Sequence, residues 1–191
     1  MAALKFKTFD NLLDAWKEDE RLELINGEIV RRPMPRSEHG LVQAAALTDL
    51  GPLSRISGTG GWWIIPEVNV RYGEHQCPCH DLAGWRKERQ PKRPSGIMEI
   101  TPDWVCEIVS PGHERKDMFH NFMLLQSYAV PYYWIISPEE KTIIAYHLVG
   151  ENYHSVFSIE CIKPEDLKKV RIPPFEEVEI DLTYVFAEIE E

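Results

Sequence analysis

The sequence predicts an α+β fold in which a mixed β-sheet is flanked by helices and extended by extra antiparallel strands. A helix, three strands, a second helix and a fourth strand are expected in that order between about residues 37 and 136. The run Trp104–Val109 is apolar except at Glu107, which is typical of a central strand buried on both faces. The 191 residues are enough for a substantial core, and we expect residues 1–191 to form a single domain.

The N-terminal part of the chain is expected to contain two helices separated by a hairpin. Residues Phe9–Glu18 carry apolar side chains at helical spacing. Residues Arg21–Arg32 centre on Asn26-Gly27, a pair typical of tight hairpin turns. Ser37 is expected to cap a helix that runs to about Leu50.

The later segments are strands and helices separated by Gly and Pro residues. The expected strands are Trp62–Tyr72, Asp81–Trp85, Trp104–Val109, Tyr132–Ile136, Thr142–Val149, Tyr153–Ile159 and Val178–Leu182. A helix over about Glu114–Tyr128 connects the third and fourth of these strands, and a short helix is expected near the C-terminus.

Composition and charge indicate a cytoplasmic protein and limit the classes of function. No apolar run approaches the roughly 20 residues that cross a bilayer, so we expect no membrane segment. The N-terminal segment is interrupted by Lys5, Lys7 and Asp10 and lacks the apolar core of a signal peptide. The formal net charge of -10 argues against a protein that coats nucleic acid nonspecifically. A DNA enzyme with a local basic patch is still compatible with this charge.

The cysteines give one alternative function. A cytosolic chain is expected to keep them reduced. Cys77-Pro-Cys79-His80 resembles a fragment of a metal site, but no second Cys/His pair stands at zinc-site spacing. We interpret the fragment as a loop with unpaired cysteines, and a zinc-stabilised binding module is the alternative.

Glu107 is the most informative residue for function. A carboxylate in an apolar strand is costly to bury without a partner. Asp81 opens a short strand after a loop, and two carboxylates on adjacent strand ends can hold Mg²⁺, which prefers oxygen ligands. Such an ion activates water and neutralises charge during phosphodiester hydrolysis. The alternatives for Glu107 are an ion pair with an Arg or Lys and a place at an exposed strand end.

Three further side chains are candidates for the same site. Glu67 is interpreted as a third ligand or an orienting group, and the alternative is an outward-facing strand residue. His39, on the second expected helix, either lines the site from the other side or is structural or exposed. Glu23 is a similar candidate, although a hairpin carboxylate is usually solvated.

A basic stretch follows the strand that Asp81 opens, and we expect it to be an exposed loop beside the site. Its functional interpretation is contact with DNA phosphates, and the alternative is a solvated loop. The basic residues are Arg86, Lys87, Arg89, Lys92 and Arg93.

These segments together resemble the bacterial putative restriction endonuclease domain family, also called the Uma-two family, of the PD-(D/E)XK nuclease superfamily. The resemblance runs from about Glu23 to Pro138, and its motifs are specific in combination. They are Glu23-Leu24-Ile25-Asn26-Gly27-Glu28, His39, Gly61-Trp62-Trp63-Ile64-Ile65-Pro66-Glu67, Asp81-Leu82-Ala83-Gly84-Trp85-Arg86, Pro102-Asp103-Trp104-Val105-Cys106-Glu107-Ile108-Val109-Ser110-Pro111 and Tyr133-Trp134-Ile135-Ile136.

The resemblance implies a restriction-endonuclease-like core and a Mg²⁺-dependent DNA-cleavage site. Asp81 matches the family's first metal-binding aspartate, and Glu107 matches its strand glutamate. The superfamily's usual lysine position holds Val109, two residues after Glu107. This family's substitute lysine, four residues after an aspartate matched by Asp117, is replaced by Asn121.

Two smaller departures from the family pattern concern neighbouring residues. His80 stands before Asp81, where the family usually has proline, and Ser137 replaces an aspartate that commonly follows the Tyr-Trp strand.

The sequence therefore predicts an endonuclease that uses Mg²⁺, with Mn²⁺ as a substitute, and that cleaves DNA slowly because Asn121 replaces the lysine. We expect a homodimer, which would suit double-strand cleavage. The alternative is a degenerate relative that binds nucleic acid or a protein partner without cutting.

Overall fold

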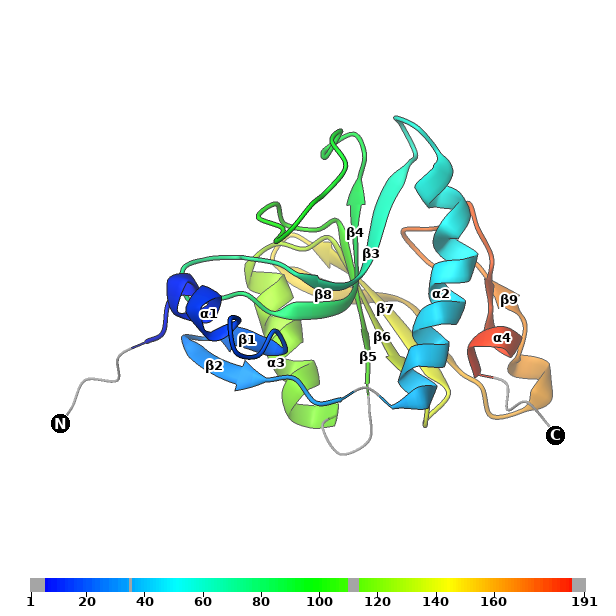
Figure 1. The fold of residues 1–191 in the computed structure, drawn as a ribbon. Helices are drawn as coiled ribbons and strands as arrows, with labels where there is room; N and C mark the ends of the chain where they lie inside the picture. Colours follow the sequence, from blue (N-terminus) through cyan, green and yellow to red (C-terminus); the bar gives the residue numbers. More distant parts are fainter. Residues whose placement is uncertain (1–5, 35, 110–113, 187–191) are drawn as a thin grey trace.

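The computed structural model describes residues 6–34, 36–109 and 114–186, with the backbone alone described at 114–118. The predicted fold class is confirmed, because a six-stranded mixed sheet lies between helices (Figure 1). None of the helices in these ranges is long and apolar enough to cross a membrane.

The central sheet has the strand order β3-β4-β5-β6-β7-β8. Its strands are β3 (Trp62–Asn69), β4 (Cys79–Arg86), β5 (Trp104–Ile108), β6 (Tyr132–Ser137), β7 (Thr142–Val149) and β8 (Asn152–Glu160). Neighbouring strands are antiparallel except β5 and β6, which are parallel. A parallel pair needs a crossover connection, and helix α3 (Glu114–Ser127) supplies it.

Helices cover both faces of the sheet because its strands alternate their apolar side chains between two cores. Helix α2 (Ser37–Arg55) packs on one core, which contains Trp104 and Trp134 and is completed by the C-terminal segments. Helix α3 packs on the other, which contains Val105 and Tyr133. The C-terminal segments are η1 (Pro164–Asp166), β9 (Lys169–Val170), β10 (Ile180–Asp181) and α4 (Leu182–Phe186).

The predicted hairpin is present and lies against the loop that precedes β4. Strands β1 (Leu22–Ile25) and β2 (Glu28–Arg31) are antiparallel, and Asn26 and Gly27 turn between them with φ of 49° and 76°. Two positive φ angles match the turn type that fits the twist of a hairpin. Backbone hydrogen bonds between Leu24 and Cys77 fix the hairpin beside the start of β4.

Several element boundaries differ from the sequence prediction. Helix α1 (Phe9–Ala15) ends earlier than expected. Ser37 is the first residue of α2 and not its cap, and the helix continues to Arg55 through Pro52, which removes one intrahelical hydrogen bond near the C-terminal end. Strand β4 begins two residues early because Cys79 and His80 pair with β3.

The predicted C-terminal strand is also divided differently. Of the residues expected in a strand over Val178–Leu182, only Ile180 and Asp181 are in β10, and Leu182 begins α4.

Candidate metal centre

Three carboxylates lie in a row across three neighbouring strands. Pro66 pairs with Leu82 and Val68 pairs with His80, so Glu67 on β3 stands opposite Asp81 on β4. The β4–β5 register, continued by one residue, places Asp81 beside Glu107. One backbone contact ties Asp81 to β5 next to Glu107: the Ile108 N–H donates to Asp81 Oδ2 at 2.7 Å.

Glu67 has an unusual backbone conformation for a strand residue. Its φ is 49°, in the left-handed region that non-glycine residues seldom adopt. The β3–β4 pairing skips this residue, although it continues on both sides. Backbone strain of this kind concentrates at functional sites. In this protein the strained residue is Glu67, whose carboxylate lies close to Asp81 and to His39 of α2.

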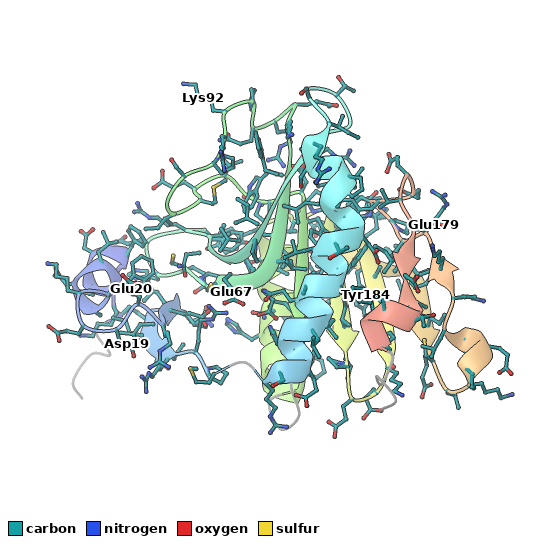
Figure 2. All side chains as sticks on the ribbon, turned by 45° about the vertical axis from the view of Figure 1, so that its right-hand side comes forward. Asp19, Glu20, Glu67, Lys92, Glu179 and Tyr184 are labelled. Carbon is teal, nitrogen blue, oxygen red and sulfur yellow. The ribbon has the colours of Figure 1, made fainter. Side chains whose placement is uncertain are left out.

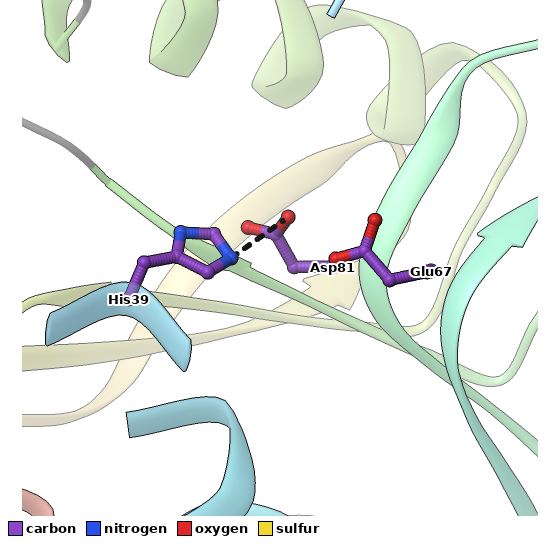
Figure 3. A group of neighbouring side chains, drawn as sticks. All are labelled: His39, Glu67 and Asp81. Atoms are coloured by element: carbon purple, nitrogen blue, oxygen red, sulfur yellow. Dashed lines mark ion pairs between the residues drawn. The ribbon is translucent and has the colours of Figure 1, made fainter. Parts of the chain in front are cut away.

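Donor atoms of His39, Glu67 and Asp81 all lie within 4.8 Å of one another, from α2, β3 and β4 respectively (Figure 3). His39 Nε2 is 3.4 Å from Asp81 Oδ1 and is buried without a hydrogen bond to any described atom. The neighbouring Asp81 carboxylate raises the pKa of His39 against the opposing effect of burial. Gln43 supports the group by donating from Nε2 to Glu67 Oε1 and to the Asp81 carbonyl oxygen.

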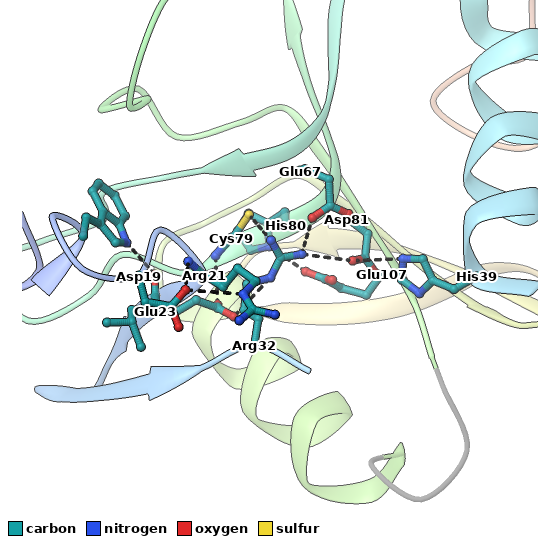
Figure 4. A network of polar contacts seen from close by, with 12 residues as sticks. Asp19, Arg21, Glu23, Arg32, His39, Glu67, Cys79, His80, Asp81 and Glu107 are labelled. Atoms are coloured by element: carbon teal, nitrogen blue, oxygen red, sulfur yellow. Dashed lines mark hydrogen bonds and ion pairs between the residues drawn. The ribbon is translucent and has the colours of Figure 1, made fainter. Parts of the chain in front are cut away.

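The Glu107 carboxylate is held by a buried chain of hydrogen bonds through His80 and Tyr72. Its Oε1 lies 2.6 Å from His80 Nδ1 (Figure 4). His80 Nε2 lies 2.9 Å from the Tyr72 hydroxyl. Burial raises the pKa of Glu107, and the charges of Asp81 and Glu23 add to this effect. Burial lowers the pKa of His80 to about 4. The His80 ring is therefore neutral at pH 7, and its contact with Glu107 fixes the orientation of the carboxylate.

The hairpin contributes one cation and one further carboxylate. Arg32, just after β2, bonds to Glu67 and lies 3.8 Å from Asp81 Oδ1 and 3.4 Å from Glu23 Oε1. Glu23 in turn accepts a hydrogen bond from the Cys79 amide at 2.9 Å. Burial is the main reason that the pKa of Glu23 is raised.

This donor set fits a divalent cation. Carboxylate oxygens are the ligands that Mg²⁺ and Mn²⁺ prefer. The orphaned nitrogen of His39 faces the same oxygens. His39, Glu67 and Asp81 are the residues that would hold the ion, and Glu107, beside Asp81 on β5, is a fourth candidate ligand. Of the four residues that the sequence nominated, the structure brings donor atoms of His39, Glu67 and Asp81 together, and Glu107, on the next strand, contacts His80.

The basic stretch is not beside Asp81, and that expectation is wrong. Strand β4 continues from Asp81 to Arg86. At ~3.3 Å per residue, the Cα atoms of Asp81 and Arg86 are about 17 Å apart. Figure 2 shows Lys92 at one edge of the molecule and Glu67 near its centre. The expected strand from Asp81 to Trp85 already covers most of this distance, because an extended strand rises ~3.3 Å per residue and carries its far end away from its first residue.

Several basic side chains of this stretch also have internal partners. Lys87 Nζ donates to the carbonyl oxygens of Ser54 and Ile56, and Arg89 forms an ion pair with Asp103. Arg86 packs over the Trp62 ring, whereas Lys92 and Arg93 are exposed.

The remaining sequence candidates are Asn121 and Asp117 on α3 and the cysteines Cys77 and Cys79. Asn121 is half-buried on α3, one turn before the fully buried Leu125. The side chain of Asp117 lies outside the described residues. Cys77 and Cys79 do not belong to the donor group found in the described part of the chain, and Cys79 Sγ accepts from Arg32 instead.

Sequence reasoning missed the roles of Arg32 and Gln43 and the contact of His80 with Glu107. The replacement of a family proline by His80 was a signal for the third. No sequence pattern marks Arg32 or Gln43 as a site residue, because each reaches the site only through the packing of the hairpin and of α2.

A mixed sheet that gathers acidic side chains on neighbouring strands, between a hairpin and a helix, defines a protein of the restriction-endonuclease-like class. The chain matches the family of putative restriction endonucleases, Uma2, over residues 6–183, and it belongs to this family. It is similar in structure to a putative nuclease of the DUF820 group from Anabaena variabilis, with a TM-score of 0.74. The two are 22% identical over 94% of this chain and 97% of the other, so this likeness concerns the fold. No curated protein matches the chain.

Replacing His80 with Ala is expected to weaken Mn²⁺ binding by roughly tenfold to a hundredfold, the usual effect of removing a residue that orients a metal ligand. The variant leaves Glu107 buried without its partner, so the free energy of unfolding should fall by about 1–3 kcal/mol. Titration calorimetry and urea unfolding measure the two effects. His154→Ala, at an exposed position on β8, is the matched control. Unchanged Mn²⁺ affinity in a folded His80→Ala protein would contradict the orienting role.

Proposed function

We propose that this protein is a Mg²⁺-dependent endonuclease that hydrolyses phosphodiester bonds of DNA. The observation that carries the proposal is the donor group of His39, Glu67 and Asp81, with Glu107 next to it on the adjoining strand. Membership of the putative restriction endonuclease family supports a nuclease, and the oxygen-rich donor set supports Mg²⁺, with Mn²⁺ as a substitute.

The side chains prepare the site for an ion and a phosphate. When bound, the ion would lower the pKa of an attacking water and offset the negative charge that develops on the phosphate. Asp81 is oriented by the Ile108 amide on Oδ2, which leaves Oδ1 facing His39. Glu107 is oriented by His80, and Gln43 holds Glu67 toward Asp81. Such preorganisation allows the ligands to bind without further rearrangement.

A plasmid-nicking assay tests the proposal. Purified protein with Mg²⁺ or Mn²⁺ should convert supercoiled plasmid to nicked and linear forms, and EDTA should stop the conversion. Binding of Mn²⁺ with no cleavage of double-stranded or single-stranded DNA would favour the second candidate. That candidate is a degenerate nuclease-fold protein that binds nucleic acid or a protein partner. It is favoured by one observation: Val109 and Asn121 occupy both positions where the superfamily and the family carry lysine.

We also propose that the active form is a single-domain protein that works as a homodimer in the cytoplasm. Two copies of one metal centre would allow both DNA strands to be cut in a single encounter. Sedimentation of the protein with and without a DNA duplex tests the dimer.

The exposed end of the basic stretch is proposed to contact DNA phosphates at a distance from the metal centre. Changing Lys92 and Arg93 to Gln should weaken DNA binding and reduce the slope of log K against log salt by about two, one for each lost contact. Changing Lys168 and Lys169 to Gln is the charge-matched control near the C-terminus. Equal slopes for the two double variants would contradict a phosphate contact at residues 92 and 93.

A further inference from the structure

Arg32 is enclosed by acidic groups of the candidate metal centre. Its Nη2 bonds to Glu67 Oε2 and lies 3.8 Å from Asp81 Oδ1. Its Nε lies 3.4 Å from Glu23 Oε1, and its Nη1 donates to Cys79 Sγ at 2.9 Å. The side chain is 22% exposed, so water screens these contacts only partly (Figure 4).

The guanidinium of Arg32 contacts the same carboxylates that would bind a divalent ion. Glu67 and Asp81 supply two of the three members of the donor group. Their carboxylates cannot be fully shared by two cations, because Arg32 and the ion would repel each other at a separation of a few ångströms. Binding of the ion and the present contacts of Arg32 therefore oppose each other.

Glu23 is a partner of Arg32 that would remain available when the ion is bound. Glu23 lies outside the donor group, in β1, and its other oxygen is held by the Cys79 amide. Arg32 can thus release Glu67 and Asp81 while its Nε contact with Glu23 keeps it in the site. A guanidinium freed in this way presents a planar pair of N–H groups that matches the oxygens of a phosphate.

We propose that Arg32 neutralises Glu67 and Asp81 while the metal is absent and contacts a substrate phosphate once the metal has taken these carboxylates. The phosphate contact rests on the proposed endonuclease function, whereas the competition for the carboxylates does not. In this arrangement Arg32 supplies the site with a cation from the hairpin side.

The competition is tested by metal binding without DNA. Arg32→Gln removes the competing charge, so the Kd for Mn²⁺, measured by electron paramagnetic resonance, should fall about tenfold, or ~1.4 kcal/mol. Arg31→Gln is the matched control, because Arg31 is the preceding residue and instead pairs with Asp19 at the surface. Its Kd should equal that of the wild type. Arg32→Gln that folds and binds Mn²⁺ no more tightly than Arg31→Gln would overturn the proposal.

The phosphate contact is tested by cleavage. Arg32→Gln should cut plasmid roughly a hundredfold to a thousandfold more slowly than the wild type at saturating Mn²⁺. Arg32→Lys keeps the charge but loses the planar fork, so it should bind Mn²⁺ as the wild type does and cut about tenfold more slowly. Wild-type cleavage by Arg32→Lys would overturn the phosphate contact, including in the case that Arg32→Gln does not fold.

The two proposals fail in different ways. A wild-type protein that binds Mn²⁺ and cuts no DNA contradicts the endonuclease and, with it, the contact to a scissile phosphate. The Mn²⁺ affinities of Arg32→Gln and Arg31→Gln still decide whether Arg32 competes for Glu67 and Asp81.

Discussion

Asp81→Asn is expected to reduce plasmid cleavage by about three orders of magnitude, the upper range for losing one charge-stabilising group. Asp81 occupies the middle of the carboxylate row, between Glu67 and Glu107, and its Oδ1 faces His39 and Arg32. Asn keeps the size of the side chain but removes its negative charge. Mn²⁺ affinity should therefore fall together with the cleavage rate, and nicking time courses and titration calorimetry measure the two effects.

The control for Asp81→Asn is Asp14→Asn, an equal change of charge at an exposed residue of α1 that forms an ion pair with Lys17. Asp81 accepts from the Ile108 amide, so the thermal stability of Asp81→Asn must be measured beside its activity. A folded Asp81→Asn protein that binds Mn²⁺ and cuts as the wild type does would place the metal centre elsewhere.

Asn121→Lys is expected to raise the cleavage rate by about a hundredfold and leave Mn²⁺ affinity nearly unchanged. Asn121 can donate a hydrogen bond but has no charge, whereas a lysine offers a cation to the developing negative charge. The position is half-buried on α3, one turn before Leu125, which packs on the same sheet face as Val105. Plasmid nicking by the wild type and the variant under identical Mg²⁺ concentrations gives the ratio.

Two comparisons make the Asn121→Lys result interpretable. Met123→Lys adds the same charge at an exposed position two residues further along α3 and should leave the rate unchanged. Asn121→Lys combined with Asp81→Asn should remain inactive, which excludes a contaminating nuclease. If Asn121→Lys folds and cuts no faster than the wild type, the absent lysine does not limit the reaction.

The sequence by itself determined which segments become helices and strands and which residue types they carry. The apolar run around Glu107 indicated a buried central strand, and Asn26-Gly27 indicated the hairpin, because both signals are local. The same reasoning nominated His39, Glu67, Asp81 and Glu107 from four separate segments. It did not establish their mutual distances, since the alternation of a strand fixes the face of a residue but not the register between strands.

Only the tertiary structure decided how these residues meet. The β3–β4 and β4–β5 registers align the three carboxylates, and the left-handed backbone of Glu67 accompanies its approach to Asp81. Docking of the hairpin against Cys77 brings in Arg32, which no local pattern marks. The direction of β4 carries Arg86 away from the site, because the strand runs in extended conformation from Asp81 to Arg86 along β3. Local patterns thus select the participants, and long-range pairing determines their contacts.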